Sequence, residues 1–245
     1  HSDYKINLEE TSKKPRSSSI AGTNFGLNFS YFPGKDEIQY GIEVQTSSTN
    51  FDFYNALNRA ITQEQNTTEI AGFLRWKKVA GKFVIEPGFR SCYYASLSEF
   101  SAEPRIGLKY NITDKLRIKA AGGLYAQNLL SASSDRDVVN LFYGFLSGSD
   151  NLPDEYDGEP VDSRLQKAWH AVAGFELDLP HHLSLNVEAY IKDFTQLENL
   201  NRDKIYDDDG DNSSKPDALK KDFIIESGTA NGIDFLLKYD YRSMY

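Results

Sequence analysis

The feature that most constrains this chain is a regular alternation of apolar and polar residues, repeated in ten separate segments. In one of them, Ile38, Tyr40, Ile42 and Val44 alternate with glutamine, glycine and glutamate. Successive side chains of a β-strand point to opposite faces, so this period predicts strands with one apolar and one polar face. The ten segments lie at residues 4–8, 25–31, 38–44, 70–76, 83–93, 106–112, 116–124, 169–179, 183–191 and 233–239. The sequence therefore predicts an all-β fold.

The predicted connections between these strands alternate between tight turns and longer loops. The tight turns are residues 33–36, 79–82, 113–115 and 180–182, and the longer connections are residues 10–19, 47–67, 95–101, 128–164 and 196–222. In an antiparallel up-and-down meander, successive connections lie at opposite ends of the sheet. All tight turns then fall at one end and all long loops at the other, which is typical of outer-membrane barrels.

Strand length favours the same interpretation. A tilted strand needs about 9 to 11 residues to cross the hydrocarbon layer, whereas strands of soluble proteins average about 5 to 6. The alternative on pattern alone is a large soluble β-sandwich or open meander, whose strands are also two-faced. Aromatic residues near strand ends fit the girdles of a membrane barrel as well as ordinary sheet propensity; they are Tyr31, Trp76, Tyr93, Tyr110, Trp169 and Tyr239.

Charge and composition exclude several classes of protein. The chain has 245 residues with 27 Lys and Arg against 36 Asp and Glu, a net charge of −9 that disfavours nucleic acid as a partner. Residues 128–164 carry −6 and residues 196–222 carry −3, so these two loops account for the whole net charge. A single cysteine excludes a disulfide framework within the chain. No apolar run approaches the ~18 residues of a spanning helix.

The chain ends suggest a larger protein. The opening HSDYKINLEE lacks a basic and apolar leader, so we expect a signal peptide to be absent or already removed. The closing KYDYRSMY has no terminal cap or tail. We therefore interpret residues 1–245 as one segment of a longer chain.

No motif in the sequence supports catalysis or metal binding. The patterns GxSxG, HExxH and CxxC and a P-loop are all missing. His181 and His182 are adjacent in a tight turn and His170 lies at the far end of the preceding predicted strand, which is a poor arrangement for a metal site. Residues 207–212 (DDDGDN) resemble a Ca²⁺ loop but lack its glycine and glutamate spacing, so we expect a solvated acidic loop. We expect no catalytic residue, cofactor or metal, and no reactive role for Cys92, which the alternation places on the polar face.

One helix is expected inside the longest loop. Residues 135–146 place Val138, Leu141, Phe142 and Phe145 at helical spacing after Ser134, a possible N-cap. Such an amphipathic helix would roof the polar face or touch a partner, or simply pack the loop against its neighbours.

Four stretches resemble TonB-dependent outer-membrane receptors. Residues 103–127 (EPRIGLKYNITDKLRIKAAGGLYAQ) resemble a hairpin of that family, and residues 169–174 (WHAVAG), 186–194 (NVEAYIKDF) and 232–238 (GIDFLLK) resemble three successive later strands. The order of the stretches carries the specificity, because each alone is only a strand and a turn. The likeness is greatest to the subset with an N-terminal carboxypeptidase-regulatory-like domain.

The resemblance implies a fold and a function. Receptors of this family are 22-stranded barrels closed around a plug, and they import scarce nutrients with energy relayed through TonB. The chain would then be one part of the barrel domain in the cell outer membrane, with the plug domain and the remaining strands absent. Its partners would be outer-membrane lipid, a nutrient ligand, the plug and TonB. The alternatives are a soluble all-β adhesin or carbohydrate-binding module, and a porin-type channel without a plug.

Overall fold

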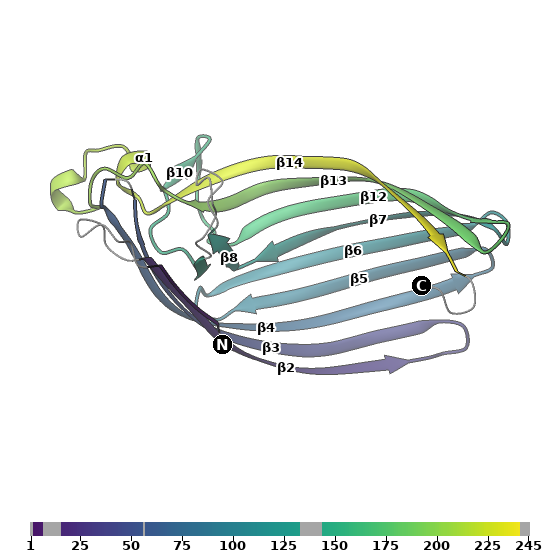
Figure 1. The fold of residues 1–245 in the computed structure, drawn as a ribbon. Helices are drawn as coiled ribbons and strands as arrows, with labels where there is room; N and C mark the ends of the chain where they lie inside the picture. Colours follow the sequence, from purple (N-terminus) through teal and green to yellow (C-terminus); the bar gives the residue numbers. More distant parts are fainter. Residues whose placement is uncertain (1, 7–15, 56, 133–143, 241–245) are drawn as a thin grey trace.

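The computed structural model describes residues 2–6, 16–55, 57–132 and 144–240, and most of them belong to one curved antiparallel sheet (Figure 1). The sheet has ten strands, each hydrogen-bonded to the next long strand along the chain. They are β1 (Ser2–Ile6), β2 (Arg16–Tyr31), β3 (Glu37–Tyr54), β4 (Ala60–Ala80), β5 (Phe83–Tyr94), β6 (Glu99–Asn111), β7 (Leu116–Gln127), β12 (Gln166–Leu179), β13 (Leu183–Leu200) and β14 (Phe223–Tyr239). The predicted all-β meander of ten strands is confirmed.

The remaining elements are short and lie in the two longest connections. Between β7 and β12 the chain forms β8 (Leu129–Ala132) paired with β9 (Gly144–Ser147), then β10 (Glu155–Tyr156) paired with β11 (Glu159–Pro160). Between β13 and β14 it forms a 3₁₀ turn, η1 (Gly210–Asn212), and one helical turn, α1 (Asp217–Lys220). Among the described residues, no helix has the length and apolar character that crossing a membrane requires.

The sheet has a turn end and a loop end, as the spacing of the segments predicts. The four predicted tight turns all join strands at the turn end. Residues 33–36 and 79–82 contain Gly34 and Gly81 at φ 70° and 61°, a backbone region that glycine enters without a steric penalty. In the β12–β13 turn, His181 and His182 both have φ 62°, a left-handed conformation that occurs in the three-residue connection between the paired residues Leu179 and Leu183.

Two predicted loops at the other end are present but shorter than predicted. Residues 47–67 are mostly strand, because β3 continues to Tyr54 and β4 begins at Ala60, and only residues 95–98 separate β5 from β6. The ladder extends past the apolar alternation through pairs of polar residues such as Thr49 and Gln65. Backbone hydrogen bonds do not need apolar side chains, so the end of the apolar pattern does not mark the end of the strand. Likewise residues 16–19 belong to β2 and residues 196–200 to β13.

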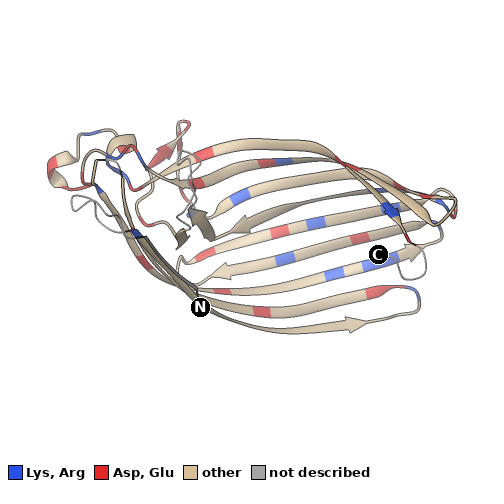
Figure 2. Cartoon of the chain, viewed as in Figure 1, with Lys and Arg blue, Asp and Glu red and all other residues tan. Residues whose placement is uncertain are grey.

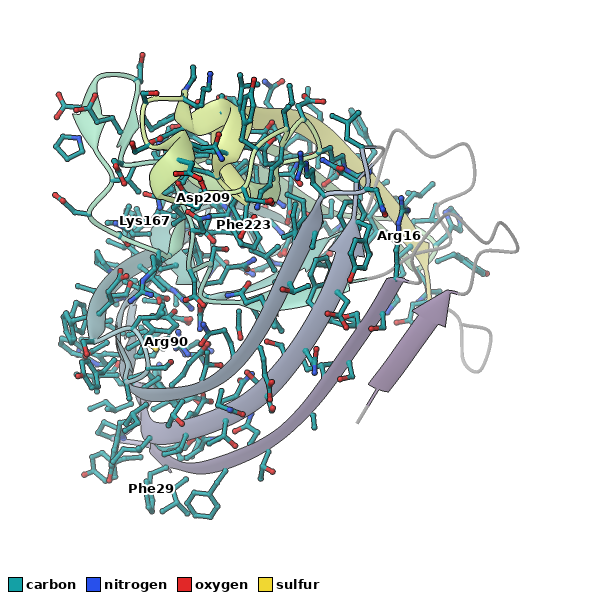
Figure 3. All side chains as sticks on the ribbon, turned by 90° about the vertical axis from the view of Figure 1, so that its left-hand side faces the viewer. Arg16, Phe29, Arg90, Lys167, Asp209 and Phe223 are labelled. Atoms are coloured by element: carbon teal, nitrogen blue, oxygen red, sulfur yellow. The ribbon has the colours of Figure 1, made fainter. Side chains whose placement is uncertain are left out.

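The convex face of the sheet is apolar and open to the surroundings. Phe29 is 52% exposed there, while Arg90 lies on the opposite, concave side (Figure 3). Many large apolar side chains share this exposure, among them Phe25, Leu27, Tyr40, Ile42, Ile70, Leu74, Phe89, Ile106, Leu108, Ile118, Phe175, Ile233, Phe235 and Leu237. A water-soluble protein rarely leaves such an area uncovered. The described chain therefore has its apolar surface on the outside of the curve.

Aromatic residues border this apolar face at both ends. Tyr31, Trp76 and Tyr239 are exposed near the turn end, and Tyr93 and Trp169 are exposed toward the loop end. Tyr110 is half-buried against the ring of Phe83, with a centroid distance of 4.4 Å. From Phe83 to Tyr93 a strand rises about 33 Å, which a tilt of 35 to 45° reduces to about 25 Å. The band thus has the height of the apolar belt of outer-membrane barrels.

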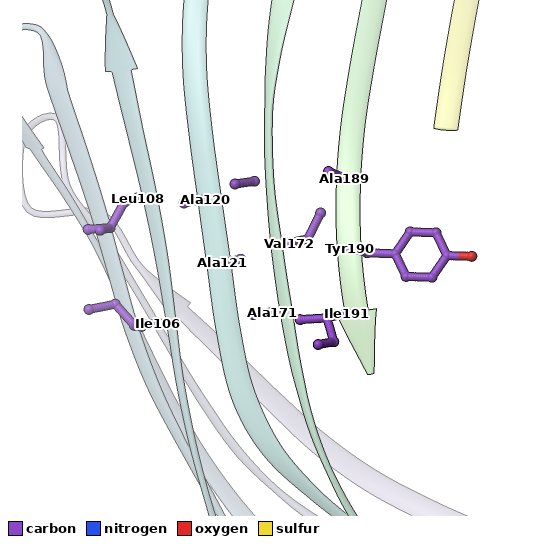
Figure 4. A pocket seen from close by; sticks show the side chains of 10 residues that line it. Ile106, Leu108, Ala120, Ala121, Ala171, Val172, Ala189, Tyr190 and Ile191 are labelled. Carbon is purple, nitrogen blue, oxygen red and sulfur yellow. The ribbon is translucent and has the colours of Figure 1, made fainter. Parts of the chain in front are cut away.

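A shallow hollow interrupts the convex face where three neighbouring strands carry alanines in register. Ala120, Ala173 and Ala189 lie in register on β7, β12 and β13, next to Leu108 of β6 (Figure 4). The hollow has a volume of about 480 Å³ and is lined almost entirely by carbon. The apolar face is therefore continuous but not flat.

We predict that Gly174 in β12 cannot be replaced without loss of stability. A Cβ atom there would lie 2.1 Å from the carbonyl oxygen of Val187, whereas a Cβ at Gly228 in β14 would meet nothing within 4 Å. Gly174→Ala should lower the free energy of unfolding by about 1 to 3 kcal/mol through overpacking, and Gly228→Ala should change it by less than about 0.5 kcal/mol. Urea unfolding in detergent micelles, followed by tryptophan fluorescence, measures both. Equal values for the two variants would contradict the close approach of β12 to β13.

Candidate functional site

A row of polar and aromatic side chains crosses the concave face just below the loop end. It consists of Arg90 on β5, Glu103 and Arg105 on β6, Tyr125 on β7 and His170 on β12. Each of these residues belongs to the polar face that the alternation predicts. We call this set the concave row.

An ion triad anchors the first half of the concave row. Glu103 is 1% exposed and accepts hydrogen bonds from Arg90 Nη1 at 3.2 Å and Arg105 Nη2 at 2.6 Å. A buried carboxylate is tolerated when charged donors pair with it, and two guanidinium groups leave the triad with one net positive charge. The triad therefore presents a cationic, half-exposed surface to the concave side.

Stacked rings continue the row. The Arg105 guanidinium lies 4.5 Å from the centroid of Tyr125, and the Tyr125 ring stacks on His170 at 4.5 Å. His170 then meets the edge of Phe194 on β13 at 6.1 Å. Beside these rings is a pocket of about 370 Å³ whose polar lining residues include Tyr190, Lys192 and Asp234. The row thus offers ring faces and charges of both signs to the concave side.

Nearer the turn end, the concave face carries an ion network. Glu176 lies 3.1 Å from Lys109, 3.2 Å from Lys119 and 3.6 Å from Arg117. Lys119 also pairs with Glu188, and Arg117 pairs with Asp178. Alternating charges on neighbouring strands stabilise one another and hold a hydrated surface. The concave face is polar along its length, in contrast to the convex one.

At the loop end, the β7–β12 connection folds into the concavity and makes an apolar core there. Leu146 of β9 and Leu130 of β8 are buried against side chains of β3, β4, β13 and β14; the cluster is Phe51, Phe53, Ile61, Leu130, Leu146, Leu200 and Phe223. We call residues 144–152 the inserted loop. It joins strands that lie on opposite sides of the curve, so the loop end is a packed layer and not an open rim.

Hydrogen bonds fix the inserted loop to β2, β3 and β4. Phe145 N donates to Ser18 Oγ at 2.9 Å, and the hydroxyl groups of Thr49 and Ser147 lie 3.0 Å apart. Gln63 Nε2 donates to the carbonyl oxygens of Ser147 at 3.2 Å and Gly148 at 2.7 Å. These bonds satisfy backbone groups that would otherwise be buried without partners.

Other contacts fix the inserted loop to β13 and β14. Ser149 Oγ donates to Glu198 Oε2 at 2.6 Å, and both residues are buried. Asn151 O accepts from Phe223 N at 3.3 Å. The loop therefore bridges both sides of the concavity with a side-chain contact on each.

The acidic loop between β13 and β14 pairs several of its charges, within the loop and with the connection between β3 and β4. Asp207 pairs with Arg59 at 3.2 Å, Asp208 lies 3.2 Å from Lys221, and Asp209 Oδ1 accepts from Asn212 N at 3.1 Å. Acidic residues recur in this loop and around β10 (Figure 2). In the described part of the chain, no group of three or more His, Cys, Asp or Glu side chains could hold a metal ion.

The structure also places the histidines and Cys92. His170 lies near the loop end of β12, whereas His181 and His182 form the turn at the other end of the same strand. Cys92 is on the concave face and fully buried, in a cluster with Ala71, Tyr94, Leu97 and Leu165.

The predicted helix of residues 135–146 is only partly described. Residues 135–143 lie outside the described residues, and Gly144–Ser147 is strand β9, so the last turn of the predicted helix is wrong. Phe145 and Leu146 pair with β8, and the Leu146 side chain is completely buried in the apolar cluster. Burial in the concavity outweighs the helical spacing of the segment.

Sequence reasoning did not identify the concave row or the attachments of the inserted loop. Alternation puts Arg90, Glu103 and Tyr125 on the polar face, but it does not say which residues of neighbouring strands are level. That requires the register, which bulges shift by a residue at 167/168 and near 194–197.

Comparisons with known proteins place the fold. No protein-family model matches the sequence, and no curated protein matches it. The siderophore receptor PirA from Pseudomonas aeruginosa matches at a TM-score of 0.55 with 8% identity, over 90% of this chain and 40% of that one. The ferric enterobactin receptor PfeA matches at 0.54 with 10% identity, over 91% and 34%. The RagAB peptide importer matches at 0.53 with 13% identity, over 94% and 29%.

These matches show that the chain has the fold of part of an outer-membrane receptor barrel. It spans less than half the length of each matched structure.

We predict that Gln63 controls how firmly the inserted loop is held. Gln63→Leu keeps the side chain's size but removes the donor to two buried carbonyl groups, which costs about 1 to 3 kcal/mol for each group left unpaired. Cleavage of residues 147–153 by a broad-specificity protease should accelerate about tenfold or more. Glu64→Leu, on the exposed face of the same strand, is the matched control and should leave the rate unchanged. Equal rates in the two variants would mean that the loop is held by its apolar cluster alone.

Proposed function

We propose that this chain is part of the barrel of a TonB-dependent receptor that takes up a scarce nutrient across the outer membrane. The observation that carries the proposal is the distribution of side chains over the sheet: apolar and exposed on the convex face, charged and paired on the concave face. A barrel in a bilayer needs that arrangement, because lipid contacts its outside and water or a plug its inside. The fold of the matched structures and the sequence resemblance support the same assignment.

The free edges of the sheet support a larger assembly. Only residues 16–20 of β2 pair with β1, so Ala21–Tyr31 present unpaired backbone groups on one side, and β14 has no partner on its outer side among the described strands. Unpaired backbone groups in hydrocarbon cost several kcal/mol each. On this proposal, the missing strands of a 22-stranded barrel cover both edges, and a plug fills the polar interior. The carboxypeptidase-regulatory-like extension would precede the plug.

A soluble adhesin or carbohydrate-binding module fits the structure less well. Such a protein would need to cover the convex apolar face, and no described segment lies over it. A porin-type channel would share the barrel but not the plug. The sequence on the N-terminal side of His1 separates the two membrane proteins, because only a TonB-dependent receptor has a plug of about 100 or more residues there.

We predict that the convex face contacts lipid. Spin labels at Tyr40 and Ile42 in the full-length protein in bilayers should be accessible to oxygen and protected from a water-soluble quencher. Labels at Gln39 and Glu43, their neighbours on the concave face, should show the reverse. Introducing Arg at position 42 should cost about 2 to 4 kcal/mol if that position is near the bilayer midplane. A monomeric, detergent-free sample with a cooperative thermal transition would count against a membrane barrel altogether.

The ligand-capture part of the proposal rests on the loop end. The two long loops carry the net negative charge of the chain, which would attract cationic or metal-bearing ligands and repel anionic ones. The concave row lies beneath them, and the ring faces of Tyr125 and His170 would contact a ligand that has passed the loops. Transport by the whole protein would follow displacement of the plug through TonB.

We predict that the tip of the β10–β11 hairpin contributes to capture and not to folding. Removing all of residues 128–164 would also remove Leu130 and Leu146 from the buried cluster, so the informative deletion is residues 155–160. It removes three acidic residues and should weaken ligand binding while heat-modifiable migration on gels, which reports barrel assembly, stays unchanged. Asp114→Asn removes one negative charge from a turn at the opposite end and is the control for a loss of charge away from the loop end. Intact binding after the deletion would exclude the tip from capture.

Orientation is tested on intact cells. A protease should cut near residues 157–158 before it cuts at Gly34 or Gly81. Cleavage first at those turns would mean that the loop end does not face outward.

A further inference from the structure

A single buried carboxyl group connects the inserted loop to β13. Glu198 is 6% exposed, and one of its oxygens, Oε2, accepts the Ser149 hydroxyl at 2.6 Å. The other oxygen, Oε1, is buried without a hydrogen-bond partner. Among the described residues, no cation lies within ion-pair distance of Glu198, whereas the other deeply buried carboxylate, Glu103, has two arginines.

The neighbours of this contact are also polar and incompletely paired. Gln63 Oε1 and both amide atoms of Asn128 are buried without partners. Gln63 contacts Gly148, and a Cβ atom on Gly148 would lie 3.5 Å from Asn128 Oδ1. These groups and Glu198 therefore all meet the three residues Ser147–Gly148–Ser149. None of them carries a positive charge that would favour an ionised carboxylate.

The charged groups around Glu198 nearly offset one another. From β6 it faces Glu99, and from the segment before β12 it faces Arg164. Arg164 already lies 4.0 Å from Glu99 and 3.6 Å from Asp150. On the β14 side its register partner is Ile225, which has no charge. The guanidinium group is thus shared among other carboxylates and is not a partner of Glu198.

We propose that the Ser149–Glu198 contact is a proton-sensitive latch, which holds the inserted loop across the concavity while Glu198 is neutral and weakens when Glu198 ionises. An ionised carboxylate held in this place has one hydroxyl donor and no counter-ion, while release of the loop exposes it to water. The latch acts on access to the concave row and does not depend on which ligand the protein carries.

The direction of the pH dependence follows from the docked and released states. Burial raises the pKa of Glu198 to about 7, against the lowering effect of the Ser149 hydrogen bond, while Glu99 raises and Arg164 lowers it further. In the released loop the group returns toward its ordinary value of 4.5. Docking is then fully favourable below pH 4.5, weakens by up to tenfold per pH unit as pH rises toward 7, and levels off above it. The total change is about 300-fold in the docking equilibrium.

The test compares the wild-type protein with Glu198→Gln, which stays neutral and keeps an oxygen for the Ser149 hydroxyl. Both are treated in detergent with a broad-specificity protease at pH 5 and pH 8, and cleavage at residues 147–153 is located by mass spectrometry. Comparing variants at the same pH cancels the pH dependence of the protease. We expect cleavage of the wild type to be at most about fourfold faster than that of Glu198→Gln at pH 5, because the released carboxyl group has begun to ionise there, and at least about tenfold faster at pH 8.

Two further measurements complete the test. Glu226→Gln, an exposed position on β14, is the matched control and should behave as the wild type at both pH values. If Glu198→Gln fails to assemble, the wild type alone is decisive. The measurement is then the ratio of cleavage at residues 147–153 to cleavage at the exposed turn residues Gly34 and Lys35, compared between pH 5 and pH 8. A constant ratio, or identical cleavage of the wild type and Glu198→Gln at pH 8, would overturn the latch.

Discussion

The continuous ladder of backbone hydrogen bonds between ten strands is the constraint on which the rest of the structure depends. It fixes which residues are level across neighbouring strands, and a slip of one residue would exchange the two faces. Because the ladder holds its register, Arg105 of β6 meets Tyr125 of β7, and Tyr125 meets His170 of β12. The concave row is thus a product of strand register and not of any local motif. The same ladder carries β3 and β4 beyond the apolar band, which provides the walls against which the inserted loop packs.

The two faces of the sheet differ in the side chains that they carry and in how these are stabilised. On the convex face, large apolar side chains remain exposed, so this face needs a covering surface that the described residues do not supply. On the concave face, charges are paired across strands, as Glu176 is with Lys109 and Lys119. A conventional apolar core exists only at the loop end, where Leu146 and its neighbours are enclosed. The loop end therefore has a source of stability of its own, which does not depend on what covers the convex face.

The sequence predicts more of this architecture than of the candidate site. Alternation located the ten strands, the four tight turns and the polar face that holds Arg90 and Cys92. It underestimated the lengths of β3 and β4, because Ser, Thr, Asn and Gln continue the hydrogen-bonded ladder without an apolar pattern in the sequence. It also gave residues 144–146 to a helix, because the spacing of apolar residues there fits both structures and only burial against β3 and β4 decides between them. The concave row and the Ser149–Glu198 contact join residues far apart in the chain, and no local pattern encodes their register.

The place of Glu198 explains how a loop can move while the sheet stays intact. Its own backbone is part of the β13–β14 ladder, paired with Ile225 and flanked by the pairs Asn199–Ile224 and Leu197–Glu226. The cost of burying its carboxyl group arises only when the inserted loop covers it, so that cost falls on loop docking and not on strand pairing. A glutamine at this position would still accept the Ser149 hydroxyl and would hold the loop equally at every pH, because it does not ionise. A carboxyl group makes the strength of docking depend on its protonation, because the strand remains fixed whether the loop is held or released.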